Sequence, residues 1–400
     1  MSERPPVVDW ASDFDHMDAR WVEDPYAIWD ELRRTCPVAH TERYGGVYLP
    51  TRMADVRAAA YDPQAFSSRR PIVRATPTTV ALPTPPISSD PPHHKPSRML
   101  LLPAFTPQAI APYIPITRRI CNELLDAIGT VDHCDAALAY TQHVPVRVIA
   151  SMLGVPESDG DLFRRWIHIM LDDTVRDDKD GAERFVAVSH EMDDYFRHHV
   201  EARKTHDGPD LISFMLRARF GEQELTERHF YGTLRLLLIA GIDTTWSSIG
   251  ASLWHLAKTP ADRRRLVAEP QLIPTAIEEF LRAFAPVTMA RHVKTDTELA
   301  GCPMKAGQML LLPFPAANRD PEAFPDADKV IIDRQDNRHV TFGLGIHRCA
   351  GSNLARMELQ VAIEEWLKRF PEFSLDAREP VTWSAGQVRG PRRLPVRIGG

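Results

Sequence analysis

The stretch that decides the fold of this chain is Phe342-Gly343-Leu344-Gly345-Ile346-His347-Arg348-Cys349-Ala350-Gly351. Its cysteine follows a glycine-rich loop and stands where a helical pattern begins, with apolar residues at spacings of four, three and four: Ala350, Leu354, Met357 and Val361. Unpaired N–H groups and the helix dipole stabilise negative charge at a helix N-terminus, so we expect this sulfur to be a thiolate and a metal ligand. A buried structural cysteine is the alternative interpretation.

The composition narrows the class of protein. The chain has 400 residues, of which 44% are hydrophobic and 26% charged, as expected for one large globular domain or two ordinary ones. A net charge of −6 argues against a general nucleic-acid-binding protein. The cysteines at positions 36, 121, 134, 302 and 349 show neither a disulfide framework nor paired zinc spacing, which is typical of a reducing compartment.

No segment of the sequence is expected to cross a membrane. Residues 1–20 lack the apolar core of a signal peptide or anchor. The most hydrophobic stretch, Leu234 to Ala240, contains Arg235 and is followed by Asp243, so it is too short and too charged to span a bilayer. We therefore expect a soluble, cytoplasmic protein.

The periodicity of the chain predicts a mainly α fold with small β-sheets in one domain, residues 1–400. Helical spacings run through 118–128, 144–153, 183–205, 228–258 and 273–285, whereas strand-like pieces lie at 46–49, 287–313 and 380–399. Residues 71–92 contain many prolines and are predicted to form a long irregular segment, either functional or a mobile surface loop.

The longest helical pattern contains the stretch Leu236-Leu237-Leu238-Ile239-Ala240-Gly241-Ile242-Asp243-Thr244-Thr245. Gly241 weakens a helix by about 1 kcal/mol relative to alanine. Asp243 is costly to bury without partners, and Thr244 can bond to a carbonyl one turn earlier and bend the helix. Such local inconsistency in a regular element indicates a functional position, although a satisfied core Asp–Thr pair is the alternative.

Taken together, these motifs identify the chain as similar to the cytochromes P450, of the soluble bacterial type. The loop quoted first resembles the family's Phe-x-x-Gly-x-His/Arg-x-Cys-x-Gly. The stretch in the long helix resembles Ala/Gly-Gly-x-Asp/Glu-Thr, and Asp90 to Arg98 resembles Asp-Pro-Pro-x-His-x-x-x-Arg. The motifs occur in the family's order from Asp90 to Cys349. The resemblance implies the cytochrome P450 fold and a bound haem b (heme b, iron protoporphyrin IX).

The resemblance also assigns roles to individual residues. It implies that Cys349 is the iron ligand, in a cofactor-binding loop that includes Phe342, Gly345 and Gly351. By the same match, the haem propionates contact four basic residues: His94, Arg98, Arg291 and His347. On the oxygen side, Ala240 and Gly241 leave room for dioxygen, Thr244 hydrogen-bonds to it and Asp243 relays protons. No role is implied for His93.

Periodicity and resemblance disagree about Glu279 and Arg282, which match the family's Glu-x-x-Arg. The apolar face of this helix lies opposite them, so periodicity alone predicts an exposed pair worth a few tenths of a kcal/mol. The resemblance implies a sheltered pair that meets Arg334 and positions the cysteine loop. We follow the resemblance, and we expect the role to be structural.

Three functions agree with these motifs. The first is a monooxygenase that takes electrons from NAD(P)H through redox partners. The second is a peroxygenase driven by hydrogen peroxide, and the third is a non-enzymatic haem-thiolate sensor. Asp243 and Thr244 favour the first, because family peroxygenases typically lack this relay. Oxygen consumption with NAD(P)H and redox partners, with peroxide alone, or with neither would separate the three.

The resemblance further implies the partners. A small or medium apolar substrate, undergoing hydroxylation or dealkylation, would contact residues 71–88, 237–244, 287–290 and 384–388. The electron donor would be a ferredoxin with its reductase, docking near Arg348 and Arg356, and the protein is expected to be a monomer. Residues 320–334, 345–356 and 386–391 resemble haem domains of self-sufficient bacterial P450s, which continue into an FMN and 2Fe–2S reductase. Whether this chain stands alone or is part of such a fusion stays open, as does the substrate.

Overall fold

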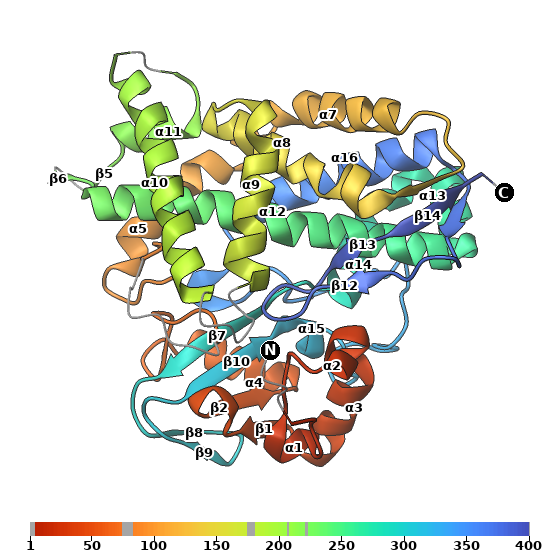
Figure 1. Cartoon of the computed structure of the whole chain (residues 1–400). Coiled ribbons are helices and arrows are strands. Elements are labelled where there is room, and N and C mark those ends of the chain that lie inside the picture. The colour runs from red at the N-terminus through yellow and green to blue at the C-terminus, as the bar shows by residue number, and fades with distance from the viewer. Residues whose placement is uncertain (1–4, 74–82, 174–180, 206–207, 221–222, 400) are drawn as a thin grey trace.

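A 32-residue helix, α12 (Glu227–Lys258), runs through the middle of the molecule (Figure 1). Thr226 caps its start by accepting a hydrogen bond from the backbone N–H of His229, and Pro260 begins the next helix just after its end. Among the described residues this is the one helix long and apolar enough to cross a membrane, but 72% of its most apolar window is buried inside the protein. Its hydrophobic surface is therefore accounted for by the core.

The computed structural model describes residues 5–73, 83–173, 181–205, 208–220 and 223–399. In this part of the chain, most of the helices pack around α12 and form the upper part of the molecule in Figure 1. These helices are α5 (His94–Leu101), α6 (Pro107–Ile110), α7 (Tyr113–Ile128), α8 (His143–Leu153), α9 (Gly160–Ile167), α10 (Gly181–Thr205), α11 (Leu211–Arg217), α13 (Pro260–Ala268), α14 (Ile273–Ala283) and α16 (Ser352–Arg369). The predicted helical segments are thus confirmed.

The principal sheet lies below the helices and has five strands in the order β1-β2-β10-β7-β3. Its strands are β1 (Val38–Thr41), β2 (Val47–Pro50), β3 (Phe66–Ser67), β7 (Thr288–Val293) and β10 (Met309–Pro313). Strand β10 pairs in parallel with β2, whereas the other pairs are antiparallel. The short helices that accompany the sheet are α1 (Trp10–Asp13), α2 (Ala19–Glu23), α3 (Pro25–Thr35), α4 (Met53–Tyr61) and α15 (Phe314–Ala317).

The remaining strands form small units. A three-stranded sheet has the order β11-β14-β4, with β11 (Phe373–Leu375), β14 (Pro395–Ile398) and β4 (His133–Asp135). Three further pairs are β5 (Arg219–Phe220) with β6 (Gln223–Glu224), β8 (Thr297–Leu299) with β9 (Cys302–Met304), and β12 (Thr382–Trp383) with β13 (Pro391–Arg393). The mainly α architecture with small sheets agrees with the prediction.

Two parts of the core meet along α12. Its first half, including Leu234, Leu238 and Trp246, packs with α8, α9 and α10, whereas its second half, from Ile249 onward, packs with α14 and α16. Met357 of α16 contacts both clusters, so the packing is continuous at this point. The helix that follows the cysteine loop is thereby held against α12, which carries the Ala240–Thr244 motif.

The irregular segment predicted at 71–92 is described in part, because residues 74–82 lie outside the described ranges. Its second half contacts the start of α12. The hydroxyl of Thr233 donates to the carbonyl of Pro85 at 3.2 Å, and a Cβ on Gly232 would come within 2.3 Å of the Pro83 carbonyl oxygen. Glycine at 232 therefore allows the loop backbone to approach the helix closely.

Candidate active site

Cys349 lies at the end of a tightly bent loop, just before α16. Its backbone N–H donates to the carbonyl of Phe342 at 2.7 Å, which closes the loop. Gly345 has φ +62°, and a Cβ there would lie 2.6 Å from the carbonyl oxygen of Ala60. Any larger residue would therefore push this loop away from α4. The helix begins at Ser352 rather than at Ala350, so the cysteine precedes the first helical turn.

The surroundings of Cys349 do not favour a thiolate by themselves. The residue has exposed surface, whereas its sulfur is surrounded by protein atoms. Burial raises the pKa of this thiol, while the N–H of Gly351 and the guanidinium groups of Arg98, Arg348 and Arg356 act in the opposite direction. The N–H of Gly351 thus acts on the pKa of Cys349 in the predicted direction, but burial outweighs it. A buried thiolate here requires a further cation, and an iron ion bound to the sulfur would supply one.

Four basic side chains from three elements gather beside this loop. His94 and Arg98 come from α5, Arg291 comes from β7, and His347 belongs to the cysteine loop. The rings of His94 and His347 are 4.3 Å apart, and Arg98 donates a hydrogen bond to the carbonyl of Arg348. His93, by contrast, is exposed. The chain thus gathers four basic side chains next to the predicted iron ligand.

Two of these basic groups have a buried nitrogen without a hydrogen-bond partner in the described part of the chain. Nε2 of His94 and Nε2 of His347 are buried and have no hydrogen-bond partner among the described residues. Burial, together with the neighbouring cations, lowers the pKa of His94 and lowers that of His347 to about 3, and burial lowers the pKa of Arg291 to about 10. A ligand with two carboxylates would supply the missing acceptors and negative charge. The cluster therefore fits the propionates of haem b.

The predicted oxygen-side residues lie along α12. Ala240 is exposed and Gly241 is half-buried, so this part of the helix borders an open space. The hydroxyl of Thr244 donates to the Ala240 carbonyl at 2.9 Å, the bond to the preceding turn that the sequence predicts. Asp243 is fully buried and forms an ion pair with Arg392, whose Nη1 is 2.8 Å from Oδ1.

Sequence reasoning did not find Arg392. It lies on β13, far from Asp243 along the chain, and its guanidinium is 5.4 Å from the ring centre of Trp246. No spacing or motif links the two ends of this ion pair. The sequence indicates only that a partner exists, since a buried aspartate requires a cationic or hydrogen-bonding group somewhere in the protein, but it does not indicate which residue that is.

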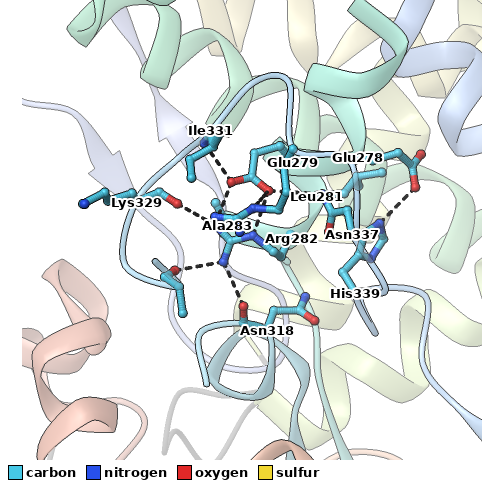
Figure 2. Close-up of polar contacts among 12 residues, drawn as sticks. Glu278, Glu279, Leu281, Arg282, Ala283, Asn318, Lys329, Ile331, Asn337 and His339 are labelled. Atoms are coloured by element: carbon cyan, nitrogen blue, oxygen red, sulfur yellow. Dashed lines mark hydrogen bonds and ion pairs between the residues drawn. The ribbon is translucent and has the colours of Figure 1, made fainter. Parts of the chain in front are cut away.

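A buried ionic network joins α14 to the irregular segment 318–337, which precedes the cysteine loop in the chain (Figure 2). Glu279 and Arg282 of α14 are both fully buried. Nε and Nη2 of Arg282 each donate to the carboxylate of Glu279 at 2.8 Å, and Nε of Arg334 donates to the same carboxylate at 3.0 Å. The pairing that the resemblance implies for these three residues is therefore present.

Backbone and amide groups complete this network. Arg282 also donates to three carbonyls, of Asn318, Ala327 and Lys329, and Glu279 accepts from the N–H of Ile331 and from Asn337. The expectation of exposure from periodicity is wrong, because this irregular segment covers the polar face of α14. Helical spacing shows which face is apolar, but it does not show that a coil segment will bury the other.

A second ionic contact holds the aromatic ring at the start of the cysteine loop. Both oxygens of Glu278 accept from Arg356, at 2.6 and 2.8 Å, and the Arg356 guanidinium lies 4.4 Å from the ring centre of Phe342. Burial raises the pKa of Glu278, but the contacts with Arg356 and His339 outweigh it and lower that pKa to about 2. The Arg356 side chain is therefore bound within the protein. Of the two arginines predicted to contact the electron donor, Arg348 is the exposed one.

The structure also joins two of the segments predicted to line the substrate pocket. Val287 bridges Val388, and the side-chain amide of Gln387 donates to the sulfur of Met289 at 3.0 Å. The start of β7 and the turn before β13 thus form one wall. Most of the wall is apolar, with Gln387 as the polar exception.

Comparisons with known proteins agree with this geometry. The sequence pattern of the family "Cytochrome P450" matches residues 146–383. A mycinamicin IV hydroxylase/epoxidase of Micromonospora griseorubida is 35% identical over 92% of this chain and 94% of that protein. A vitamin D(3) 25-hydroxylase of Pseudonocardia autotrophica is 34% identical over 94% of both chains. The crystal structure of CYP109E1 from Bacillus megaterium with testosterone has a TM-score of 0.86 and 32% identity, and the match covers 94% of this chain and 98% of that one. The chain belongs to the cytochrome P450 family and is a haem b monooxygenase.

Proposed function

We propose that this protein inserts one oxygen atom of dioxygen into a small or medium apolar organic molecule, by hydroxylation or dealkylation, with electrons from NAD(P)H. The observation that carries the proposal is the position of Cys349 beside a cluster of four basic side chains, two of which, His94 and His347, have a buried ring nitrogen without a partner among the described residues. This donor set suits a flat metal cofactor with two carboxylates, and it gives the metal a sulfur ligand from the chain.

In this proposal the cofactor is held from two sides. Cys349 ligates the iron, while His94, Arg98, Arg291 and His347 bind the propionates. The N–H of Gly351 points toward the sulfur and the bend at Gly345 keeps the loop against α4, so the ligand cannot move far. When bound, haem b supplies the redox-active iron at which dioxygen is activated.

On the opposite side of the cofactor, residues of α12 would bind dioxygen and deliver protons. Ala240 and Gly241 leave room because they have little or no side chain. The hydroxyl of Thr244, which now donates to the Ala240 carbonyl, can rotate to hydrogen-bond to dioxygen. Asp243 would deliver protons to this hydroxyl or to water next to it. Its ion pair with Arg392 holds the carboxylate in place.

The substrate class follows from the pocket wall and from the relatives. Val287, Met289 and Val388 offer apolar contacts, and Gln387 offers one polar group. Relatives are named for mycinamicin IV and vitamin D3, and CYP109E1 was crystallised with testosterone. A substrate screen by shift of the haem absorption band should therefore include large apolar molecules beside small ones.

The proposed electron donor is a ferredoxin with its reductase, since the relatives named above are ordinary bacterial P450s. A fused FMN and 2Fe–2S reductase stays a prediction from the sequence alone, and so does a monomeric state. The donor would approach near Arg348, which is exposed and adjoins the iron ligand. An acidic partner surface would make this association dependent on ionic strength.

The relay variants test the function. Thr244→Ala should keep NAD(P)H consumption but divert it to hydrogen peroxide, whereas Asp243→Asn should slow turnover because an amide is a poor proton carrier. Product, peroxide and NAD(P)H are measured in one assay with a competent donor, and both variants should retain the haem. If both remained as fast and as tightly coupled as wild type, the relay would be refuted. If peroxide alone supported equal turnover, a peroxygenase would be the better assignment.

A further inference from the structure

Asp90 occupies a junction between two elements that carry basic residues of the cofactor site. Its carboxylate side chain is only 9% exposed. Oδ2 accepts a hydrogen bond from the hydroxyl of Ser67 at 2.6 Å, and Oδ1 accepts one from the backbone N–H of Ser68 at 2.8 Å. The side chain is therefore fastened to strand β3.

Strand β3 in turn fixes the strand that carries Arg291. Ser67 is paired with His292 of β7, the residue after Arg291. A two-residue strand at a sheet edge has few ladder bonds of its own, so side-chain contacts contribute much of what holds it in register. The contacts of Asp90 with Ser67 and Ser68 are of this kind.

The backbone of Asp90 makes the second half of the connection. Its carbonyl accepts a hydrogen bond at 3.0 Å from the N–H of His94, the first residue of α5. One residue thus links the start of α5, with His94 and Arg98, to the sheet edge with Arg291. The separation of these basic groups depends on that link.

The charge of Asp90 also affects the basic residues of the cofactor site. Burial lowers the pKa values of His94 and Arg291, and the Asp90 carboxylate acts against this lowering at both residues. Arg69 is exposed and lies 3.8 Å from the carboxylate, so solvent screens this ion pair and it neutralises little of the charge of Asp90. Asp90 therefore favours the charged forms that bind carboxylates.

We propose that Asp90 is a positioning residue for haem: it holds α5 and β7 in the relative placement that lets His94, Arg98 and Arg291 bind the propionates together. Asp90 contacts no part of the cofactor in this proposal and acts through the basic residues. The inference rests on the proposed function, because it takes these residues to be the propionate contacts.

The experiment compares rates of haem loss from purified holoprotein to excess apomyoglobin. Asp90→Ala should accelerate haem loss by roughly 10- to 100-fold, the range typical when a residue that orients ligand-binding groups is removed. Asp90→Asn should lie between wild type and Asp90→Ala, because its amide oxygen can still accept from Ser68 and its nitrogen can donate to Ser67, whereas the negative charge is lost. Rescue by this isosteric residue separates a hydrogen-bonded link from a general packing effect.

Asp62→Ala is the matched control. Asp62 also accepts two backbone N–H bonds, from Gln64 and Ala65 at 3.0 Å, just before the same strand, but among the described residues it forms no hydrogen bond or ion pair with α5. Its replacement should leave haem loss unchanged. If Asp62→Ala and Asp90→Ala accelerated haem loss equally, the effect would be one of general stability and the inference would be overturned.

Arg291→Ala separates this inference from the proposed function. If Arg291→Ala keeps haem as well as wild type, the propionate assignment itself fails. If Arg291→Ala loses haem quickly but Asp90→Ala does not, only the role of Asp90 fails. In the double variant the two effects should be clearly less than additive, since Asp90 acts through Arg291, and full additivity would contradict the inference. Ser67→Ala, which removes one hydroxyl from the junction, should accelerate haem loss several-fold and serves where Asp90→Ala yields no holoprotein.

Discussion

Replacing Glu279 with glutamine should lower the free energy of unfolding by about 3–5 kcal/mol, because it leaves two buried guanidinium groups without their carboxylate. Glu279 and Arg282 have no exposed side-chain surface, and Arg334 is only 8% exposed, so water cannot replace the lost charge. A glutamine oxygen can still accept hydrogen bonds from Nη2 of Arg282 and from Ile331, but the amide nitrogen cannot accept those that Nε of Arg282, Arg334 and Asn337 donate to the other oxygen. The loss therefore combines the missing charge with missing hydrogen bonds. Folded proteins are stable by only about 5–15 kcal/mol, so this change should be large.

Glu278→Gln is the control on the same helix. Glu278 also binds an arginine through both oxygens, but its side chain is 30% exposed and that of Arg356 is 33% exposed. Solvent screens this pair, so its loss should cost about 1 kcal/mol. Urea unfolding of the haem-loaded proteins, followed by tryptophan fluorescence, measures both variants. The reasoning is refuted if Glu279→Gln lowers the unfolding midpoint no more than Glu278→Gln does.

Two further predictions follow from the same surroundings. The pKa of Glu278 is lowered to about 2 from an ordinary 4.5, so its contribution to stability is complete above about pH 4.5 and is lost as the pH falls through 2. The difference in urea midpoint between wild type and Glu278→Gln should therefore shrink steadily from pH 5 downward. A constant difference would exclude this linkage. Arg348→Glu should slow the first electron transfer from a ferredoxin several-fold at low ionic strength while substrate affinity stays nearly unchanged, because the residue is exposed next to the predicted iron ligand. Stopped-flow reduction rates across a salt series measure this effect. Equal rates for both proteins at every ionic strength would contradict the prediction.

The structural features that the sequence predicted are those that a short stretch of sequence specifies. Helical spacing predicts α12 and α16 because each buries a long apolar stripe, and a bent loop ending in a cysteine is visible from the spacing of its glycines. Thr244 bonds to the preceding turn as its residue type and position suggest. Such features depend on residues a few positions apart.

The parts that were missed depend on contacts between distant segments. The Asp243–Arg392 pair joins α12 to β13, and nothing in either segment alone identifies its partner. The burial of Glu279 depends on an irregular segment that lies across the polar face of α14. The effect of burial, which raises the pKa of Cys349, was also missed, because desolvation depends on how much of the protein surrounds the sulfur and not on its place in the helix.

The central claim is that the Cys349 sulfur is the ligand of a haem iron. The most direct measurement is the absorption spectrum of the reduced carbon-monoxide complex of wild type and of Cys349→His. Wild type should absorb at the long-wavelength position of thiolate ligation, and Cys349→His should absorb at the position of imidazole-ligated haem, while replacement of Cys36, Cys121, Cys134 or Cys302 leaves the wild-type band. An unchanged band in Cys349→His, or a shift on replacing one of the other four, would contradict the account.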